Sequence, residues 1–341
     1  MATIPVTSEE PGSDLIRYAE NGTFSAPALA AALRLAGVTP DAAAWRRFFD
    51  RLLIISGALL AGAGVIFFVA YNWQALGRYA RFGMLEALIL ASTLYALAAG
   101  LGALRAQAAL LFAVLAQGGL LALLGQTYQT GADNYELFLA WALVALPWVL
   151  AARWAPQWGL WWTLINLALA LYLFQVLDPL RLLFFGRMRP GALVLLNLTG
   201  LAAFEWAGVR YAELRTRWLP RYCGLLALAA GTFAALLFVL DDGREDNGAG
   251  CGIYLLMIAG GAWFYQYRRH DLFPLAFGVL SLIIVVTGWV GRHLFSSNSA
   301  FGSLTLLAVL VIGSSAGATL WLRDLNRKWN VQAPAPMVGP A

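Results

Sequence analysis

Long uninterrupted apolar stretches constrain this chain more than any other feature of its sequence. An α-helix rises about 1.5 Å per residue, so about 20 apolar residues cross the roughly 30 Å hydrocarbon core of a bilayer. The chain is 61% hydrophobic and only 12% charged, whereas soluble domains carry about 25% charged residues. The stretches are continuously apolar and do not alternate as the strands of a β-barrel would. We therefore expect an all-α, polytopic integral membrane helix bundle.

Ten membrane-spanning helices are predicted, and the basic residues orient them. If the N-terminus is cytoplasmic, the inside segments hold 16 Arg and Lys and the outside loops hold 7. Basic residues favour the cytoplasmic side of a membrane, so both termini are predicted to be cytoplasmic. The predicted spans are residues 52–71, 82–104, 107–124, 137–154, 159–177, 191–207, 222–240, 251–267, 272–290 and 302–322.

Two short helices are predicted before the first span. Ser25-Ala26-Pro27 is a typical helix start, Gly37 is a typical stop, and Thr39 is expected to cap the next helix. That second helix either lies at the membrane interface or continues into the first span. The predicted organisation is a small cytoplasmic helical region (1–50), a transmembrane bundle (51–325) and a flexible cytoplasmic tail (326–341).

The stretch GQTYQTGADNYELF, residues 125–138, interrupts two apolar runs with polar side chains. It contains no basic residue, which places it on the outer face. Gly131 suits a turn that requires a positive φ, and Asp133 with Glu136 has the spacing of a capping box. Capping accounts for the glycine and the two acids, but it does not account for the amides and the tyrosine.

Other polar residues are predicted at the same depth as this turn. Asn72 and Trp73 end the first span, and Glu86 lies near the outer end of the second. Gln117 and Asn166 lie deeper and would extend a polar path inward. A carboxylate within a span is costly unless it is neutral or paired, so Glu86 is expected to join one hydrogen-bonded network with the turn. The predicted ligand-binding residues are Asn72, Trp73, Glu86, Gln117, Gln126, Tyr128, Gln129, Thr130, Asp133 and Glu136.

Two segments carry a resemblance to a known family. AYNWQALGRYARFGMLEAL and GQTYQTGADNYELFLAWALVALPW resemble the predicted bacterial membrane proteins grouped as domain of unknown function 2157. The resemblance covers residues 40–180 best. It implies a multi-pass protein of the bacterial inner membrane, and it implies no activity.

The sequence contains no recognisable catalytic motif, such as a P-loop, a dinucleotide-binding fingerprint or a serine elbow. Cys223 and Cys251 are predicted on opposite faces of the membrane, so no disulfide between them is expected. His270 and His293 are also predicted on opposite faces, so no zinc site is expected. We expect no catalytic residue, no cofactor and no nucleic-acid partner. Membrane lipids are the expected partners, and a membrane-protein partner is left open.

Three functions remain open at this point. The first is binding or transport of a small polar or amphipathic ligand through a polar pocket near the periplasmic face. The second is an accessory or scaffold role within a larger membrane assembly. The third is an enzyme acting on a lipid-linked substrate, with Glu86, Asp133 or Glu136 as acid or base. Glu205, the other acid well inside a span, is expected at the inner interface, close enough to Arg210 in sequence to pair with it.

Overall fold

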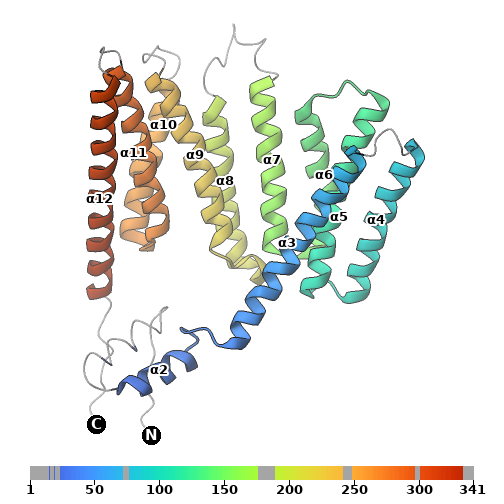
Figure 1. Cartoon of the computed structure of the whole chain (residues 1–341), viewed down its shortest axis with the longest axis horizontal. Helices are drawn as coiled ribbons and strands as arrows, with labels where there is room; N and C mark the ends of the chain where they lie inside the picture. The colour runs from blue at the N-terminus through green and yellow to red at the C-terminus, as the bar shows by residue number, and fades with distance from the viewer. Residues whose placement is uncertain are drawn as a thin grey trace.

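The protein is a bundle of long helices, as the apolar stretches predict (Figure 1). The computed structural model describes residues 15, 19, 24–71, 77–175, 189–240, 248–295 and 300–332. Within these ranges every regular element is helical. The long helices are α3 (Ala42–Tyr71), α4 (Arg78–Ala99), α5 (Leu104–Tyr128), α6 (Asn134–Ala152), α7 (Ala155–Gln175), α8 (Arg189–Arg210), α9 (Trp218–Leu240), α10 (Gly248–Phe264), α11 (Leu272–Phe295) and α12 (Ala300–Gln332).

Each predicted span overlaps mainly with one of these helices, from α3 to α12, and several predicted ends differ by a few residues from those of the helix. Of the ten long helices in the described ranges, eight are long and apolar enough to cross a membrane. The two that are not counted are α7 and α10. Successive helices run in alternating directions, so that α3 begins and α12 ends at the same end of the bundle (Figure 1). We call this the basal end and the opposite one the distal end. The protein is therefore a polytopic helical membrane protein.

The helices before the first span form nearly as predicted. α2 (Ala26–Leu35) begins after Ser25, and Gly37 has a φ of +71° just beyond its end. The next helix is part of α3, which continues without a break to Tyr71. The prediction of Thr39 as its cap is wrong, because the Asp41 carboxylate accepts a hydrogen bond from the Ala44 N–H at 2.6 Å. An aspartate also interacts more favourably with the positive end of the helix dipole than a threonine does.

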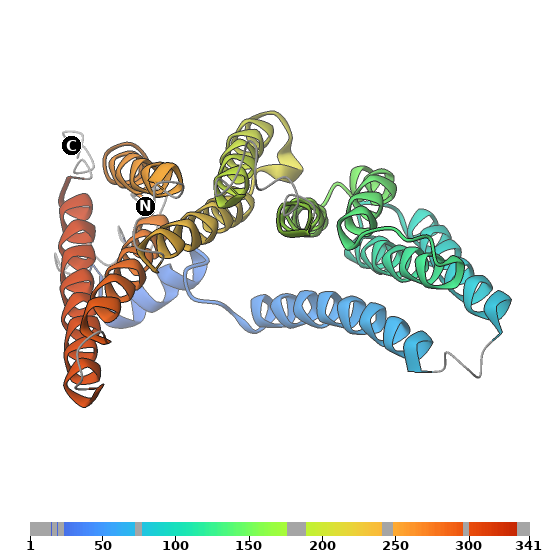
Figure 2. The same ribbon diagram turned by 90° about the horizontal axis from the view of Figure 1, so that it is seen from above.

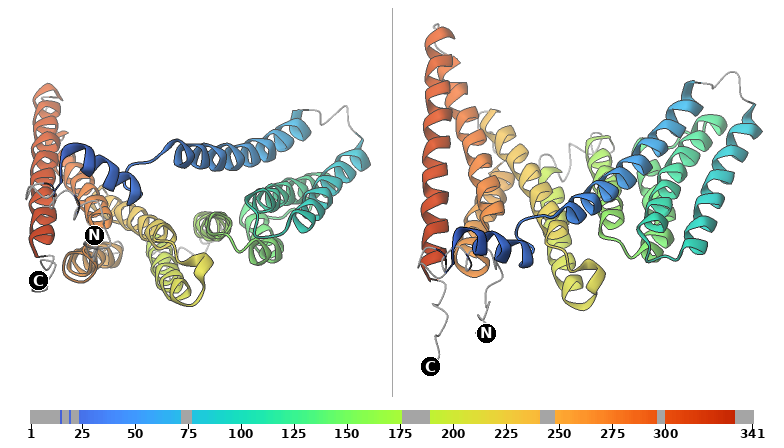
Figure 3. Two further views of the ribbon diagram at one scale, coloured as in Figure 1. Left: turned by 90° about the horizontal axis from the view of Figure 1, so that it is seen from below. Right: turned by 60° about the horizontal axis from the view of Figure 1, so that its bottom comes forward.

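The bundle has two halves, each packed around one helix. α5 contacts α3, α4 and α6, whereas α9 contacts α8, α10 and α11. α7 packs on α6 and makes smaller contacts with α8 and α9, and it stands between the halves in the view from above (Figure 2). The central helix has a different place in the order of each half, so the two halves are not structural repeats. α3 and α12 lie at the margins with most of their apolar side chains exposed, as lipid-facing helices are (Figure 3).

Tryptophan indoles connect neighbouring helices in the first half. The Trp141 N–H on α6 donates to the Val114 carbonyl on α5 at 2.8 Å, and Trp148 donates to Thr93 Oγ1 on α4 at 2.9 Å. Trp161 on α7 donates to the Ala142 carbonyl at 2.9 Å. A buried indole N–H needs an acceptor, and each of these bonds reaches another helix. The indoles therefore help to set which helices are neighbours.

A fourth indole joins α7 to the second half. The Trp162 N–H donates to Asn197 Oδ1 on α8 at 2.8 Å, and the Asn197 amide donates in turn to Asn166. The Trp162 ring lies against Gly200, where an added Cβ would come within 2.2 Å of the ring. Close approach of helices at small residues is the usual way that membrane helices pack. Asn166 thus takes part in helix packing and does not continue a path from the distal end.

Candidate functional site

The polar turn predicted from residues 125–136 forms at the distal end, where α5 ends and α6 begins. Gln129 has a φ of +46° and Gly131 a φ of +66°, and these two residues terminate α5 and reverse the chain. Asp133 and Glu136 form the predicted capping box, in which the Glu136 carboxylate accepts the Asp133 N–H at 3.2 Å. The positive φ predicted at Gly131 and the capping box predicted at Asp133 and Glu136 are both confirmed.

The predicted ligand-binding residues are mostly on the surface. Glu86, Gln126, Tyr128, Gln129, Thr130, Asp133 and Glu136 are exposed, and Asn72 and Trp73 lie outside the described residues. The Tyr128 ring packs 6.1 Å from the Phe82 ring, which brings the distal ends of α4 and α5 together. Within the described ranges, however, Glu86 makes no hydrogen bond or ion pair with the turn. The expected network around Glu86 is therefore wrong for this part of the chain, because its carboxylate is exposed.

Gln117 differs from the other predicted residues because it is buried. Its side chain is only 4% exposed in the middle of α5, and neither its amide nitrogen nor its oxygen has a hydrogen-bond partner. A buried amide without a partner costs about 1–3 kcal/mol. The amide of Gln117 is therefore available to form hydrogen bonds with a water molecule or with a polar group of a ligand.

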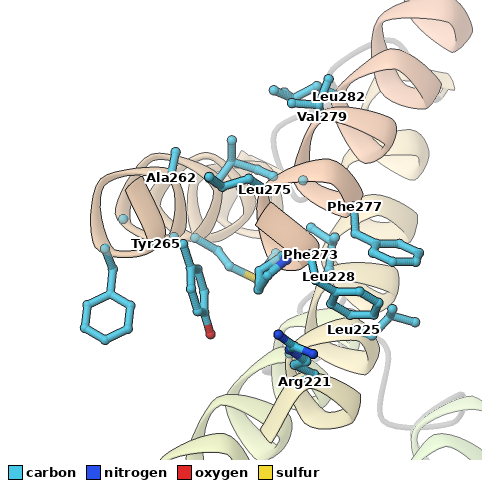
Figure 4. A pocket seen from close by; sticks show the side chains of 18 of the residues that line it. Arg221, Leu225, Leu228, Ala262, Tyr265, Phe273, Leu275, Phe277, Val279 and Leu282 are labelled. Atoms are coloured by element: carbon cyan, nitrogen blue, oxygen red, sulfur yellow. The ribbon is translucent and has the colours of Figure 1, made fainter. Parts of the chain in front are cut away.

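A cavity of about 410 Å³ lies in the second half, between α9, α10 and α11 (Figure 4). We call it the apolar cavity, because nearly all of the side chains that line it are apolar. They include Leu225 and Leu228 on α9, Met257 and Ala262 on α10, and Leu275 and Leu282 on α11. A space of this size, apolar on most sides with polar groups at one place, is typical of a small-molecule site.

Glycines create the space between the three helices. Gly260, Gly261 and Gly278 line the apolar cavity. An ideal Cβ at Gly260 or Gly261 would have no neighbouring atom within 4 Å, and one at Gly278 would meet only Ile258, at 4.0 Å. These glycines therefore face empty space, unlike Gly200, which contacts an indole ring. The pair Gly260-Gly261 inside an apolar run was the available sequence signal for the cavity.

Charged and polar groups gather at the basal end of the apolar cavity. The Arg221 guanidinium donates two hydrogen bonds to Asp271 Oδ2, at 2.7 and 3.1 Å, and lies 5.1 Å from the Phe273 ring centre. Arg221 and the Tyr265 hydroxyl occupy the same end of the cavity, and Val279 and Leu282 the other (Figure 4). We call Arg221, Tyr265 and Asp271 the charged mouth.

A π-helical turn, η4 (Tyr265–Arg269), continues α10 into this mouth. Such turns are rare and occur often at functional sites. Its last residue, Arg269, forms an ion pair of 2.6 Å with Glu205 on α8. Glu205 therefore pairs with Arg269 and not with Arg210, which is close enough in sequence to have been its partner. The true partner lies 64 residues along the chain, so only the folded bundle brings the two side chains together.

Hydroxyl groups join the same three helices on the distal side of the apolar cavity. Ser281 Oγ on α11 lies 2.6 Å from Thr232 Oγ1 on α9 and 2.8 Å from the Tyr254 hydroxyl on α10. Each of these residues is about one helical turn from a residue that lines the cavity, namely Leu228, Met257 and Gly278. α9, α10 and α11 are thus connected both distal and basal to the apolar cavity.

Comparison with known families identifies the N-terminal part of the chain. Residues 17–158 match the family described as predicted membrane protein (DUF2157). This is the family that the sequence resembles. The DUF2157 match covers α2 to α6 and the start of α7, so the apolar cavity lies outside it. No curated protein and no solved structure matches the chain.

Proposed function

We propose that this protein binds an amphipathic molecule and that the apolar cavity holds the hydrocarbon part of that molecule. The observation that carries the proposal is the cavity itself. It offers about 410 Å³ between three helices, with a mostly apolar lining and with an arginine, its aspartate partner and a tyrosine at one end. A chain with a polar group at one end matches this distribution of polarity.

The membrane is the natural source of such a ligand. Helices α9 and α11, which line the cavity, are long and apolar enough to cross a membrane, and a lipid chain would then reach the cavity without crossing water. A gap between helices that remained empty would lose dispersion contacts with every atom that lines it. The excess of basic residues at the basal end supports a cytoplasmic position for that end, and the family resemblance supports a location in the inner membrane of a bacterium.

Filling the cavity tests this proposal. We expect Gly261→Leu and Gly278→Leu to place side chains in the cavity and to reduce lipid retention at least tenfold. Native mass spectrometry of the purified protein with palmitoyl-oleoyl phosphatidylglycerol measures the retained lipid. Gly252→Leu is the matched control, because Gly252 lies on α10, does not line the cavity and has no atom within 4 Å of an ideal Cβ. Equal retention by all three variants and the parent would reject the proposal.

A second candidate is the polar ligand site predicted at the distal end. The buried, unpartnered amide of Gln117 favours it, since a polar ligand or water entering the first half would satisfy that amide. A polar ligand bound there is expected to raise the thermal unfolding midpoint of the parent and to leave that of Gln117→Met unchanged. A ligand that stabilises both proteins equally would bind elsewhere.

A further inference from the structure

A second cavity lies between α11 and α12, beyond the distal end of the apolar cavity. Its volume is about 380 Å³, and its lining is apolar apart from Thr287 and Ser314. The Ser314 hydroxyl does not require a ligand, because it donates to the Leu310 carbonyl of its own helix at 2.6 Å. We call this cavity the distal groove, and hydrocarbon matches most of its surface.

The distal groove and the apolar cavity share three lining residues: Val279 and Leu282 on α11 and Trp321 on α12. Val279 and Leu282 lie at the end of the apolar cavity opposite Arg221 (Figure 4). All three shared side chains are partly exposed, so they border both spaces and are not packed as a wall between them. The two spaces therefore adjoin at these side chains.

Hydroxyl contacts determine in which direction this path continues. Ser281 on α11 contacts Thr232 on α9 and Tyr254 on α10, at 2.6 and 2.8 Å, distal to the apolar cavity. These contacts draw the three helices together there, with Ser281 and Tyr254 buried. A chain that extends beyond Leu282 therefore turns toward α12 and enters the distal groove.

The distal groove itself ends where α11 and α12 come together. An ideal Cβ at Gly291 on α11 would lie 3.4 Å from Leu307 on α12, which is ordinary van der Waals contact. An ideal Cβ at Gly317, which lines the groove, would have no neighbouring atom within 4 Å. Gly317 therefore leaves the space between the two helices open, whereas the contact at Gly291 closes it.

The path has a defined length along α11. The apolar cavity extends from Phe273 to Leu282, and the distal groove continues to Thr287. With a rise of about 1.5 Å per residue, the cavity accounts for about 14 Å and the groove for about 7 Å more. One leaflet of the hydrocarbon layer is about 15 Å deep, half of the full thickness. A chain that fills the whole path must therefore be long and extended, whereas a short chain fits within the apolar cavity alone.

We propose that the apolar cavity and the distal groove together select ligands by chain length, and that they hold one long hydrocarbon chain of a lipid. This inference rests on the function proposed above and specifies the chain of its ligand. A short chain would leave the distal groove empty and would lose the dispersion contacts that Val286 and Leu310 offer there. Gly317 determines the selection, because its missing side chain leaves room for the far end of the chain.

Two lysophosphatidylglycerols with the same head group, one octanoyl and one palmitoyl, test this selection. Native mass spectrometry of the full-length protein measures how much of each lipid is retained by the parent and by Gly317→Leu. The leucine would occupy the distal groove and leave the apolar cavity unchanged, since Gly317 lines the groove and not the cavity. We expect the variant to retain about tenfold less palmitoyl lipid than the parent and the same amount of octanoyl lipid, because only the longer chain loses its contacts.

Gly313→Leu is the matched control. Gly313 lies one turn before Gly317 on α12, has no atom within 4 Å of an ideal Cβ, and lines neither space. Equal loss of palmitoyl lipid in the two variants would overturn the selection, because the effect would then come from a general change in α12. An equally large loss of octanoyl lipid in Gly317→Leu would overturn it for the same reason.

The outcomes also separate this inference from the proposed function. Undiminished palmitoyl retention in Gly317→Leu, with both lipids lost in Gly278→Leu, would overturn the chain-length selection and leave the apolar cavity as a chain site. Undiminished retention of both lipids in Gly278→Leu would reject the proposed function itself. Dioctanoyl phosphatidylglycerol, which has two short chains, is expected to bind Gly317→Leu as well as the parent. A loss as large as that of the palmitoyl lipid would overturn the single path and assign the distal groove to a second chain.

Discussion

The Arg221 guanidinium lies 2.7 Å from the Asp271 carboxylate and joins the basal end of α9 to the residue just before α11. Both side chains are partly buried, with 33% and 20% of their surfaces exposed. Asp271 also accepts the Phe273 N–H at 3.1 Å, so one carboxylate orients the arginine and caps the helix. This pair fixes the position of the charge at the end of the apolar cavity.

Asp271→Asn is expected to lower the free energy of unfolding by about 1–3 kcal/mol, because hydrogen bonds to a charged group contribute about that much. The thermal unfolding midpoint in detergent measures the effect. Asp324→Asn makes the same chemical change in an exposed pair with Lys328 on α12, where the cost is about 0.5 kcal/mol or less. Equal shifts in the two variants would mean that the Arg221 pair has no special structural role.

The contact between Gly200 and Trp162 gives a sharper test of how the two halves of the bundle join. Gly200→Ala would place a Cβ 2.2 Å from the Trp162 ring and force α7 away from α8. Overpacking of this kind costs about 1–3 kcal/mol. Gly313→Ala on α12 is the control, since no atom lies within 4 Å of an ideal Cβ there. If unfolding midpoints show both variants to be as stable as the parent, the indole does not pack on Gly200.

Much of this fold follows from hydropathy and from local rules. The ten apolar stretches predict the helices α3 to α12, and Asp133 and Glu136 predict their own capping box, because these signals lie within a few residues of each other. The partners of Glu205 and Arg221 could not be predicted in this way. Arg269 and Asp271 lie 64 and 50 residues away in sequence, and nothing local specifies which helix ends meet.

The site illustrates the same limit. Polar residues are conspicuous in an apolar sequence, so the polar turn drew the prediction to the distal end. The apolar cavity depends instead on where side chains are missing, at Gly260, Gly261 and Gly278. A glycine that lets two helices touch and a glycine that leaves a gap look the same in sequence. Only the packing of α9, α10 and α11 distinguishes them.

Replacing the buried amide of Gln117 is expected to raise the stability of the protein, whereas Asp271→Asn and Gly200→Ala are expected to lower it. Without a ligand, Gln117→Met is expected to stabilise the purified protein by about 1–3 kcal/mol, because the amide is buried without a partner and a thioether needs none. Gln126→Met, at an exposed position of the same helix, is expected to leave stability unchanged. Loss of stability in Gln117→Met would show that a bound water or ligand already satisfies the amide.

The most direct test of lipid binding in the apolar cavity is photo-crosslinking from within a bilayer. The protein is reconstituted with phosphatidylglycerol that carries a diazirine on its acyl chain, irradiated, and mapped by mass spectrometry of its peptides. The account predicts labels on side chains that line the cavity, such as Leu228, Met257 and Leu282, and their loss in Gly278→Leu. Labels confined to exposed residues of the marginal helices, such as Leu60 and Ile312, would contradict it.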